Sequence, residues 1–142
     1  MKFLVHIIFV MLLVAGLMSC KNNDNEPDLI RAGEMVRING SEIIDLENSK
    51  PYICENYDEL RALLGNAAPM NIDFDKNVII IIKDIAYEGI SDICAEVTYS
   101  DGYDVRVMVT LNYTDPVAAW CIGAVAPNIG SRITHLTIEY LH

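Results

Sequence analysis

Two stretches of alternating side chains constrain the fold of this chain more than any other feature of its sequence. In residues 93–99 and 103–111, apolar residues alternate with polar ones, as in strands that bury one face. A connection formed by residues 100–102 makes apolar side chains meet across the strands, whereas a two-residue loop would mix the faces. We therefore predict an antiparallel hairpin with Gly102 in the left-handed conformation. The predicted cross-strand pairs are Tyr99 with Tyr103, Val97 with Val105, Ala95 with Val107 and Glu96 with Arg106.

The other apolar stretches predict further strands. Residues 77–83 (NVIIIIK) contain five consecutive apolar β-formers, which indicates a central strand covered on both faces. Residues 117–126 form an almost uncharged stretch, and residues 132–141 alternate as in a half-exposed strand.

A second hairpin is predicted near the start of the mature chain. Asn39-Gly40 is a strong two-residue turn signal between residues 36–38 and residues 41–44. The expected pairs are Arg37 with Glu42 and Val36 with Ile43, so that charge meets charge and apolar meets apolar.

One segment predicts a helix. Asn56 can cap it, Glu59 stands three residues later as in a capping box, and Gly65 can end it. The residues expected on its buried face are Tyr57, Leu60, Leu63 and Leu64. The predicted fold is α+β and mainly β: a mostly antiparallel sheet of about six to seven strands, with one short helix packed on it between the first hairpin and the central strand.

The first residues of the chain resemble a targeting signal. Lys2 precedes an apolar stretch over residues 3–18, which is too short to span a bilayer as a stable helix. The following Leu17-Met18-Ser19-Cys20 resembles the lipobox of bacterial lipoproteins, and the resemblance implies cleavage before Cys20 and acylation of this residue. An ordinary cleaved signal peptide with a chance cysteine is the alternative.

These features divide the chain into a signal peptide (residues 1–19), a lipidated cysteine with a polar tether (20–28) and a single β-rich domain (29–142). By analogy with bacterial lipoproteins, Lys21 favours the outer membrane over the inner one. The acidic residues of the tether leave it open whether the domain faces the periplasm or the cell surface. The membrane is thus an expected partner, through the lipid anchor.

The charge excludes one class of partner. The 142 residues carry 10 basic and 20 acidic side chains, a formal net charge of −10. Such a surface repels phosphate backbones, so no nucleic-acid partner is expected.

The order of elements resembles that of a known family. The resembling segments are residues 71–77 (NIDFDKN), 115–120 (DPVAAW) and 125–127, within about residues 57–140. The chain is similar to the carboxy-terminal domain of the protease-complex-subunit family and to small lipoproteins of Bacteroidota that share its plan. The resemblance implies a binding or accessory module and supplies no catalytic residue.

Several residues invite a chemical interpretation. Asp73, Asp75 and Asn77 match the start of a calcium loop, but the apolar strand that follows cannot surround an ion, so we predict a polar turn. His135 shares a strand face with Thr137 and Glu139, where a solvated position is the default and a His–Glu pair the alternative. Trp120 could contact a ligand, although one tryptophan in an apolar strand is more often part of a core.

Three cysteines follow the lipidation site: Cys54, Cys94 and Cys121. Outside the cytoplasm one disulfide could form among them, with a pairing that the sequence does not determine. Free or structural cysteines are favoured over a catalytic thiol, because no basic neighbour is evident to stabilise a thiolate.

No catalytic constellation, metal site or cofactor motif emerges, so neither a metal nor a cofactor is expected. The leading hypothesis is a non-enzymatic, lipid-anchored module that binds an envelope protein or an extracellular ligand. The alternatives are a small hydrolase or glycan-acting enzyme with carboxylates brought together by the fold, and a protease inhibitor or protease-complex subunit.

Overall fold

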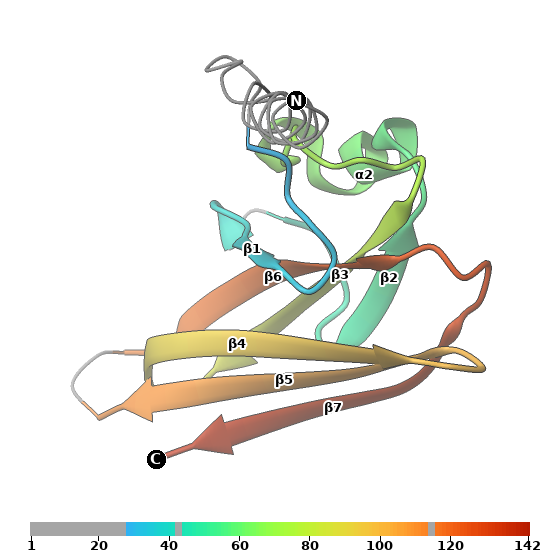
Figure 1. Cartoon of the computed structure of the whole chain (residues 1–142). Helices are drawn as coiled ribbons and strands as arrows, with labels where there is room; N and C mark the ends of the chain where they lie inside the picture. The colour runs from blue at the N-terminus through green and yellow to red at the C-terminus, as the bar shows by residue number, and fades with distance from the viewer. Residues whose placement is uncertain (1–27, 42–43, 114–115) are drawn as a thin grey trace, which may run out of the picture.

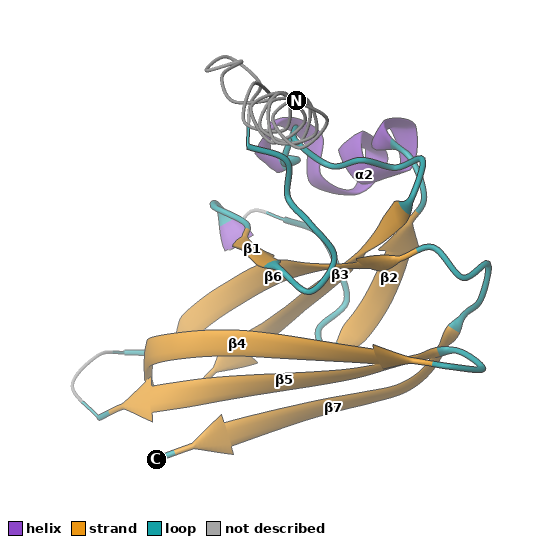
Figure 2. Ribbon diagram, viewed as in Figure 1, coloured by secondary structure: helices purple, strands orange, loops and turns teal. Residues whose placement is uncertain are grey.

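A computed structural model describes residues 28–41, 44–113 and 116–142 and shows two packed β-sheets with a short helix (Figures 1 and 2). The four-stranded sheet has the order β1 (Met35–Arg37), β6 (Ala118–Pro127), β3 (Asn77–Ala86) and β2 (Lys50–Cys54). The three-stranded sheet has the order β4 (Gly89–Tyr99), β5 (Tyr103–Asn112) and β7 (Ile133–Leu141). The predicted mainly β, mostly antiparallel fold is therefore confirmed, with its strands divided between two sheets.

The helix forms where the sequence predicts it. Helix α2 (Tyr57–Leu64) continues into a short 3₁₀ turn, η2 (Gly65–Ala67). The Asn56 side chain accepts a hydrogen bond from the Glu59 amide, and the Glu59 carboxylate accepts one from the Glu55 amide. Gly65, with φ of 54°, donates its amide to the Arg61 carbonyl and ends the helix. The helix lies on the outer side of the four-stranded sheet, away from the three-stranded one (Figure 2).

Strand β3 is covered on both faces, as predicted. Ile80 and Ile82 pack with the strands of the three-stranded sheet, whereas Ile79 and Ile81 pack beneath helix α2. All four side chains are completely buried, because alternation along a strand sends neighbours to opposite layers. The same alternation places Asp84, further along β3, on the face that looks toward the three-stranded sheet.

The hairpin between β4 and β5 has the predicted register, with all four expected pairs in place. The prediction for Gly102 is wrong: its φ is not positive. Glycine is needed there for space instead, because a Cβ atom would lie 2.4 Å from Thr134 Cγ2 and 2.8 Å from the Arg132 carbonyl oxygen. Strand β7 approaches this turn and pairs with β5 in parallel.

The first predicted hairpin is not found in its described residues, because Ser41 and Ile44 of the expected second strand lie in no strand. Strand β1 pairs with β6, with Val36 opposite Gly123, and Arg37 forms an ion pair with Asp92 at 3.0 Å. Its expected partners, Glu42 and Ile43, lie outside the described residues.

The geometry of the expected turn also argues against this hairpin. Ser49 is the one described residue other than glycine with a positive φ, so Asn39 does not adopt the left-handed conformation of a type I′ turn.

Strand β2 was not expected from its sequence, KPYIC, which is short and contains proline.

In the described part of the chain, no helix is long and apolar enough to cross a membrane. The signal peptide, Cys20 and the tether as far as residue 27 lie outside the described residues.

Candidate functional site

A hollow of about 430 Å³ opens near the ends of β3, β5 and β7. Three chain segments gather at this end of the molecule: the β3–β4 turn, the end of β5 and the carboxy terminus (Figure 1). The residues that line the hollow are Asn48, Asp84, Ile85, Tyr87, Glu88, Leu111, Tyr140 and His142. Its size suits a small ligand or one side chain of a larger partner.

Asp84 lines the hollow, and both of its carboxylate oxygens accept hydrogen bonds. Its Oδ2 accepts hydrogen bonds from Ser49 Oγ at 3.0 Å and from the Tyr140 hydroxyl at 2.9 Å, and its Oδ1 accepts one from the Ile85 amide at 2.8 Å. Both carboxylate oxygens are thus held by neutral donors. This network ties the four-stranded sheet to the last strand of the three-stranded sheet.

Tyr140 lines the hollow and lies beside Trp120, which is part of the core. Burial raises the pKa of Tyr140 to about 12, and the hydrogen bond to Asp84 adds to the rise, while the neighbouring indole of Trp120 opposes it. The hydroxyl is therefore protonated at neutral pH and serves as a hydrogen-bond donor.

Glu88 is the least satisfied group of the site. Its Oε2 atom is buried and has no hydrogen-bond donor in the described part of the chain. The nearest basic atom is His142 Nδ1, at 4.0 Å. This oxygen is sealed from solvent, whereas the Glu88 side chain as a whole is 39% exposed, so a ligand can reach the side chain only at its other atoms.

Aromatic rings surround the opening. Tyr87, in the β3–β4 turn, is 84% exposed, and Tyr113, after β5, is 73% exposed. The Tyr113 ring stacks on the His142 ring, with centroids 5.4 Å apart and planes inclined by 12°. This end of the sandwich therefore presents flat apolar rings beside carboxylates.

Trp120 lines a second hollow of about 330 Å³, to which residues of β6 and β4 contribute. The side chain is only 4% exposed, and its Nε1 has no partner at hydrogen-bond geometry among the described residues, although it lies near enough to the Tyr140 hydroxyl to lower the pKa of that group. It packs with the buried side chains between the sheets. Trp120 therefore belongs to the core, as the sequence favoured, and also lines this second hollow.

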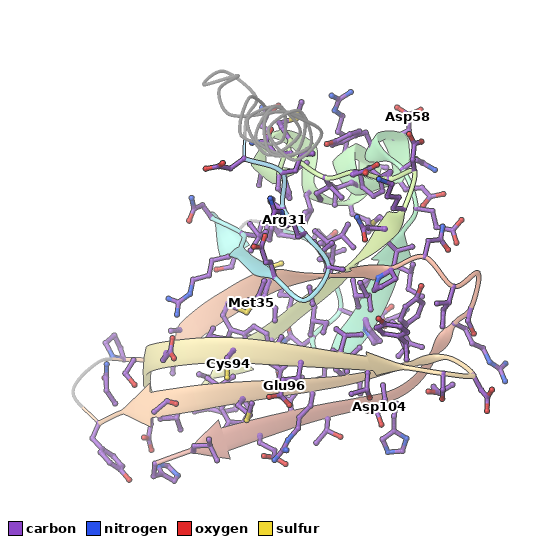
Figure 3. All side chains as sticks on the ribbon, viewed as in Figure 1. Arg31, Met35, Asp58, Cys94, Glu96 and Asp104 are labelled. Atoms are coloured by element: carbon purple, nitrogen blue, oxygen red, sulfur yellow. The ribbon has the colours of Figure 1, made fainter. Side chains whose placement is uncertain are left out.

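His135 lies away from the hollow. It is exposed on β7, in register with Asp104 of β5, toward the end of the sheet opposite the carboxy terminus (Figure 3). Glu139 forms an ion pair at 2.8 Å with Arg106, so the His–Glu pair considered from the sequence is not formed. The solvated position of His135 is confirmed.

The segment that resembles a calcium loop is a polar turn, as predicted. Asp73 accepts hydrogen bonds through its carbonyl from the amides of Lys76 and Asn77, and through Oδ1 from the amide of Asp75 at 3.1 Å. Within the three described ranges, no cluster of three or more acidic, histidine or cysteine side chains could hold a metal ion.

Cys54, Cys94 and Cys121 carry free thiols. Cys54 and Cys121 are buried beneath helix α2, and burial raises their thiol pKa values to about 12 and about 11. Cys94 is exposed on the outer face of β4 (Figure 3). The free or structural interpretation of the cysteines agrees with this arrangement.

Sequence reasoning missed Asp84, Glu88, Tyr140 and His142. One signal could have found Asp84: it occupies the same strand face as Ile80 and Ile82, where a charge is unexpected. The other three come from separate segments, and only the fold brings them together.

Comparisons with known proteins identify no relative. The chain matches no protein-family model, and neither a curated protein nor a solved structure resembles it significantly.

Proposed function

We propose that this protein is a lipid-anchored binding module whose ligand site is the hollow around Asp84, Glu88 and Tyr140. The single observation that carries the proposal is the hollow itself, a cavity of ligand size whose lining includes Asp84, the partly exposed side chain of Glu88 and Tyr140. Exposed Tyr87 and Tyr113 supply apolar contact area at the rim.

Binding is favoured over catalysis by the way Asp84 is held. A glycan-acting enzyme needs two carboxylates free to face a substrate, and Asp84 and Glu88 do line the same hollow. Both oxygens of Asp84, however, accept hydrogen bonds from Ser49, Ile85 and Tyr140. This carboxylate shapes the wall of the site and has no oxygen free of protein donors.

The site is tested by fragment screening of the full chain in a neutral detergent, with a library of neutral, anionic and cationic compounds. Amide NMR signals of Glu88, Leu111 and Tyr140 should shift when fragments bind. Leu111→Trp, which fills the hollow, should abolish these shifts, whereas Leu29→Trp, at an exposed position elsewhere, should leave them unchanged. Fragments that bind only elsewhere, or not at all, would contradict the proposed site.

The compartment is a separate part of the proposal. The lipobox-like segment supports acylation of Cys20 and an outer-membrane location, facing the periplasm or the cell surface. Mass spectrometry of the native protein should find a new amino terminus at Cys20 with acyl chains attached. Cys20→Ala should lack this mass and leave the membrane fraction; retention of Met1 in the native protein would refute the anchor.

A further inference from the structure

Two exposed apolar side chains lie close to the first described residue of the chain. Leu29 is 50% exposed and Met70 is 60% exposed. Their segments are held side by side, because Ile30 and Ile72 form a parallel bridge. The Tyr57 hydroxyl accepts a hydrogen bond from the Ile72 amide at 2.8 Å and so fixes the second segment. The two apolar side chains therefore project from hydrogen-bonded segments.

Two arginines accompany this apolar pair. Arg61 Nη2 lies 4.0 Å from Met70 Sδ, and the exposed Arg31 follows Leu29 by two residues. Neither guanidinium forms an ion pair with a described residue, although acidic side chains outnumber basic ones by 20 to 10 in the sequence. We call Leu29, Arg31, Arg61 and Met70 the amino-end face. Apolar groups beside guanidiniums without carboxylate partners suit contact with phospholipid headgroups, because guanidinium binds phosphate in a bidentate manner.

The sequence places this face near the proposed acylation site. Asp28, the first described residue, comes eight residues after Cys20. A fully extended chain advances about 3.5 Å per residue, so the two residues can be at most about 28 Å apart. Two apolar side chains alone bind a bilayer weakly, but an acyl anchor at this distance gives them a high effective concentration of lipid.

The hollow lies at the other end of the domain. Strand β3 begins at Asn77, five residues after Ile72, and ends at Ala86, near the carboxy-terminal end of the molecule (Figure 1). At about 3.3 Å per residue, this strand separates the two ends by about 30 Å. A bilayer in contact with the amino-end face would therefore leave the hollow open to the aqueous side.

We propose that the amino-end face rests on the surface of a phospholipid bilayer, with Leu29 and Met70 among the headgroups and Arg31 and Arg61 paired with lipid phosphates. This inference goes beyond the proposed binding role and rests on the proposed acylation of Cys20. The acyl chains alone leave the domain free to turn on its tether. Contact through this face gives it one orientation, with the hollow directed away from the membrane.

Quenching of tryptophan emission by brominated lipids tests the orientation. The acylated full chain is reconstituted into vesicles of phosphatidylethanolamine and phosphatidylglycerol whose acyl chains carry bromine close to the headgroups. Met70→Trp introduces an indole on the amino-end face. Val117→Trp is the matched control, because Val117 is 58% exposed and precedes Ala118, which pairs with Ala86 at the far end of β3. The wild type, with Trp120 buried, supplies the background emission.

The two variants should differ clearly. Met70→Trp should lose about half of its added emission, because an interfacial side chain lies about 5–10 Å deep in the headgroup boundary. Val117→Trp should lose no more than the wild type does. Equal quenching of the two variants, or quenching of neither, would overturn the proposal.

A second pair of variants tests the contact with phosphate, each combined with Met70→Trp. Arg61→Gln should lower the ratio of docked to undocked protein about fivefold, as expected for one cation at an anionic lipid surface. Arg132→Gln makes the same change in the connection between β6 and β7, where the arginine is also exposed and forms no ion pair with a described residue. If the two variants quench alike, Arg61 contacts no phosphate and the inference fails.

Flotation of the vesicles separates this inference from the acylation on which it rests. Protein that floats with the vesicles while Met70→Trp stays unquenched would retain the anchor and refute the docking; the face would then be covered by the tether or by another protein. Protein that does not float would refute both the anchor and the docking. The fragment screen of the hollow is carried out in detergent, so its result is independent of this one.

Discussion

The hydroxyl of Tyr103 tests how the connection between β6 and β7 is held against the start of β5. The ring is completely buried, and the hydroxyl donates to the Pro127 carbonyl at 2.8 Å and accepts from the Ile129 amide at 3.0 Å. Tyr103→Phe removes both bonds and leaves two backbone groups without their partner. At about 1 kcal/mol for each bond, with a further penalty for the unpaired groups, the loss is about 2–3 kcal/mol.

Urea denaturation of the full chain measures this loss, because Trp120 is the single tryptophan and is buried. With a slope of about 2 kcal/mol per molar urea, the unfolding midpoint should fall by about 1–1.5 M. Tyr87→Phe removes an exposed hydroxyl and is the matched control, expected within about 0.5 kcal/mol of the wild type. If Tyr103→Phe is as stable as this control, the hydroxyl does not hold the connection between β6 and β7.

Three further outcomes follow from the packing. Gly102→Ala should destabilise the chain by about 1–3 kcal/mol, because its Cβ would overlap Thr134 and a backbone carbonyl; an unchanged midpoint in urea would contradict this. A thiol reagent at neutral pH should label Cys94 in the native chain, and Cys54 and Cys121 only after unfolding, as mass spectrometry can count. Stability should fall as the pH rises above 9: the thiols of Cys54 and Cys121 ionise near pH 9 in the unfolded chain, whereas in the folded chain their pKa values are about 12 and about 11. Their alanine variants should show a shallower decline in urea midpoint between pH 8 and pH 10.5, and an identical slope would refute this assignment.

The elements that sequence reasoning predicted best are those decided by nearby residues. The β4–β5 register follows from alternation and loop length, and a shift by one residue would expose every buried side chain of the hairpin. The cap of helix α2 depends on Asn56 and Glu59, three residues apart. Ile79 and Ile80 predict a strand buried on both faces without reference to any distant segment.

The tertiary structure decided the pairing of distant segments. Strand β1 lies next to β6, and β7 runs parallel to β5, because extended apolar strands compete for the same edges and loop closure depends only weakly on loop length. Even the role of Gly102 depends on the approach of β7. The hollow could not be predicted for the same reason. Asp84, Glu88 and Tyr140 come from separate segments of the chain, and they line one cavity only because the fold brings these segments together. Alternation along a strand and capping of a helix are determined by residues close together in the sequence, whereas a site depends on contacts between residues far apart in the chain.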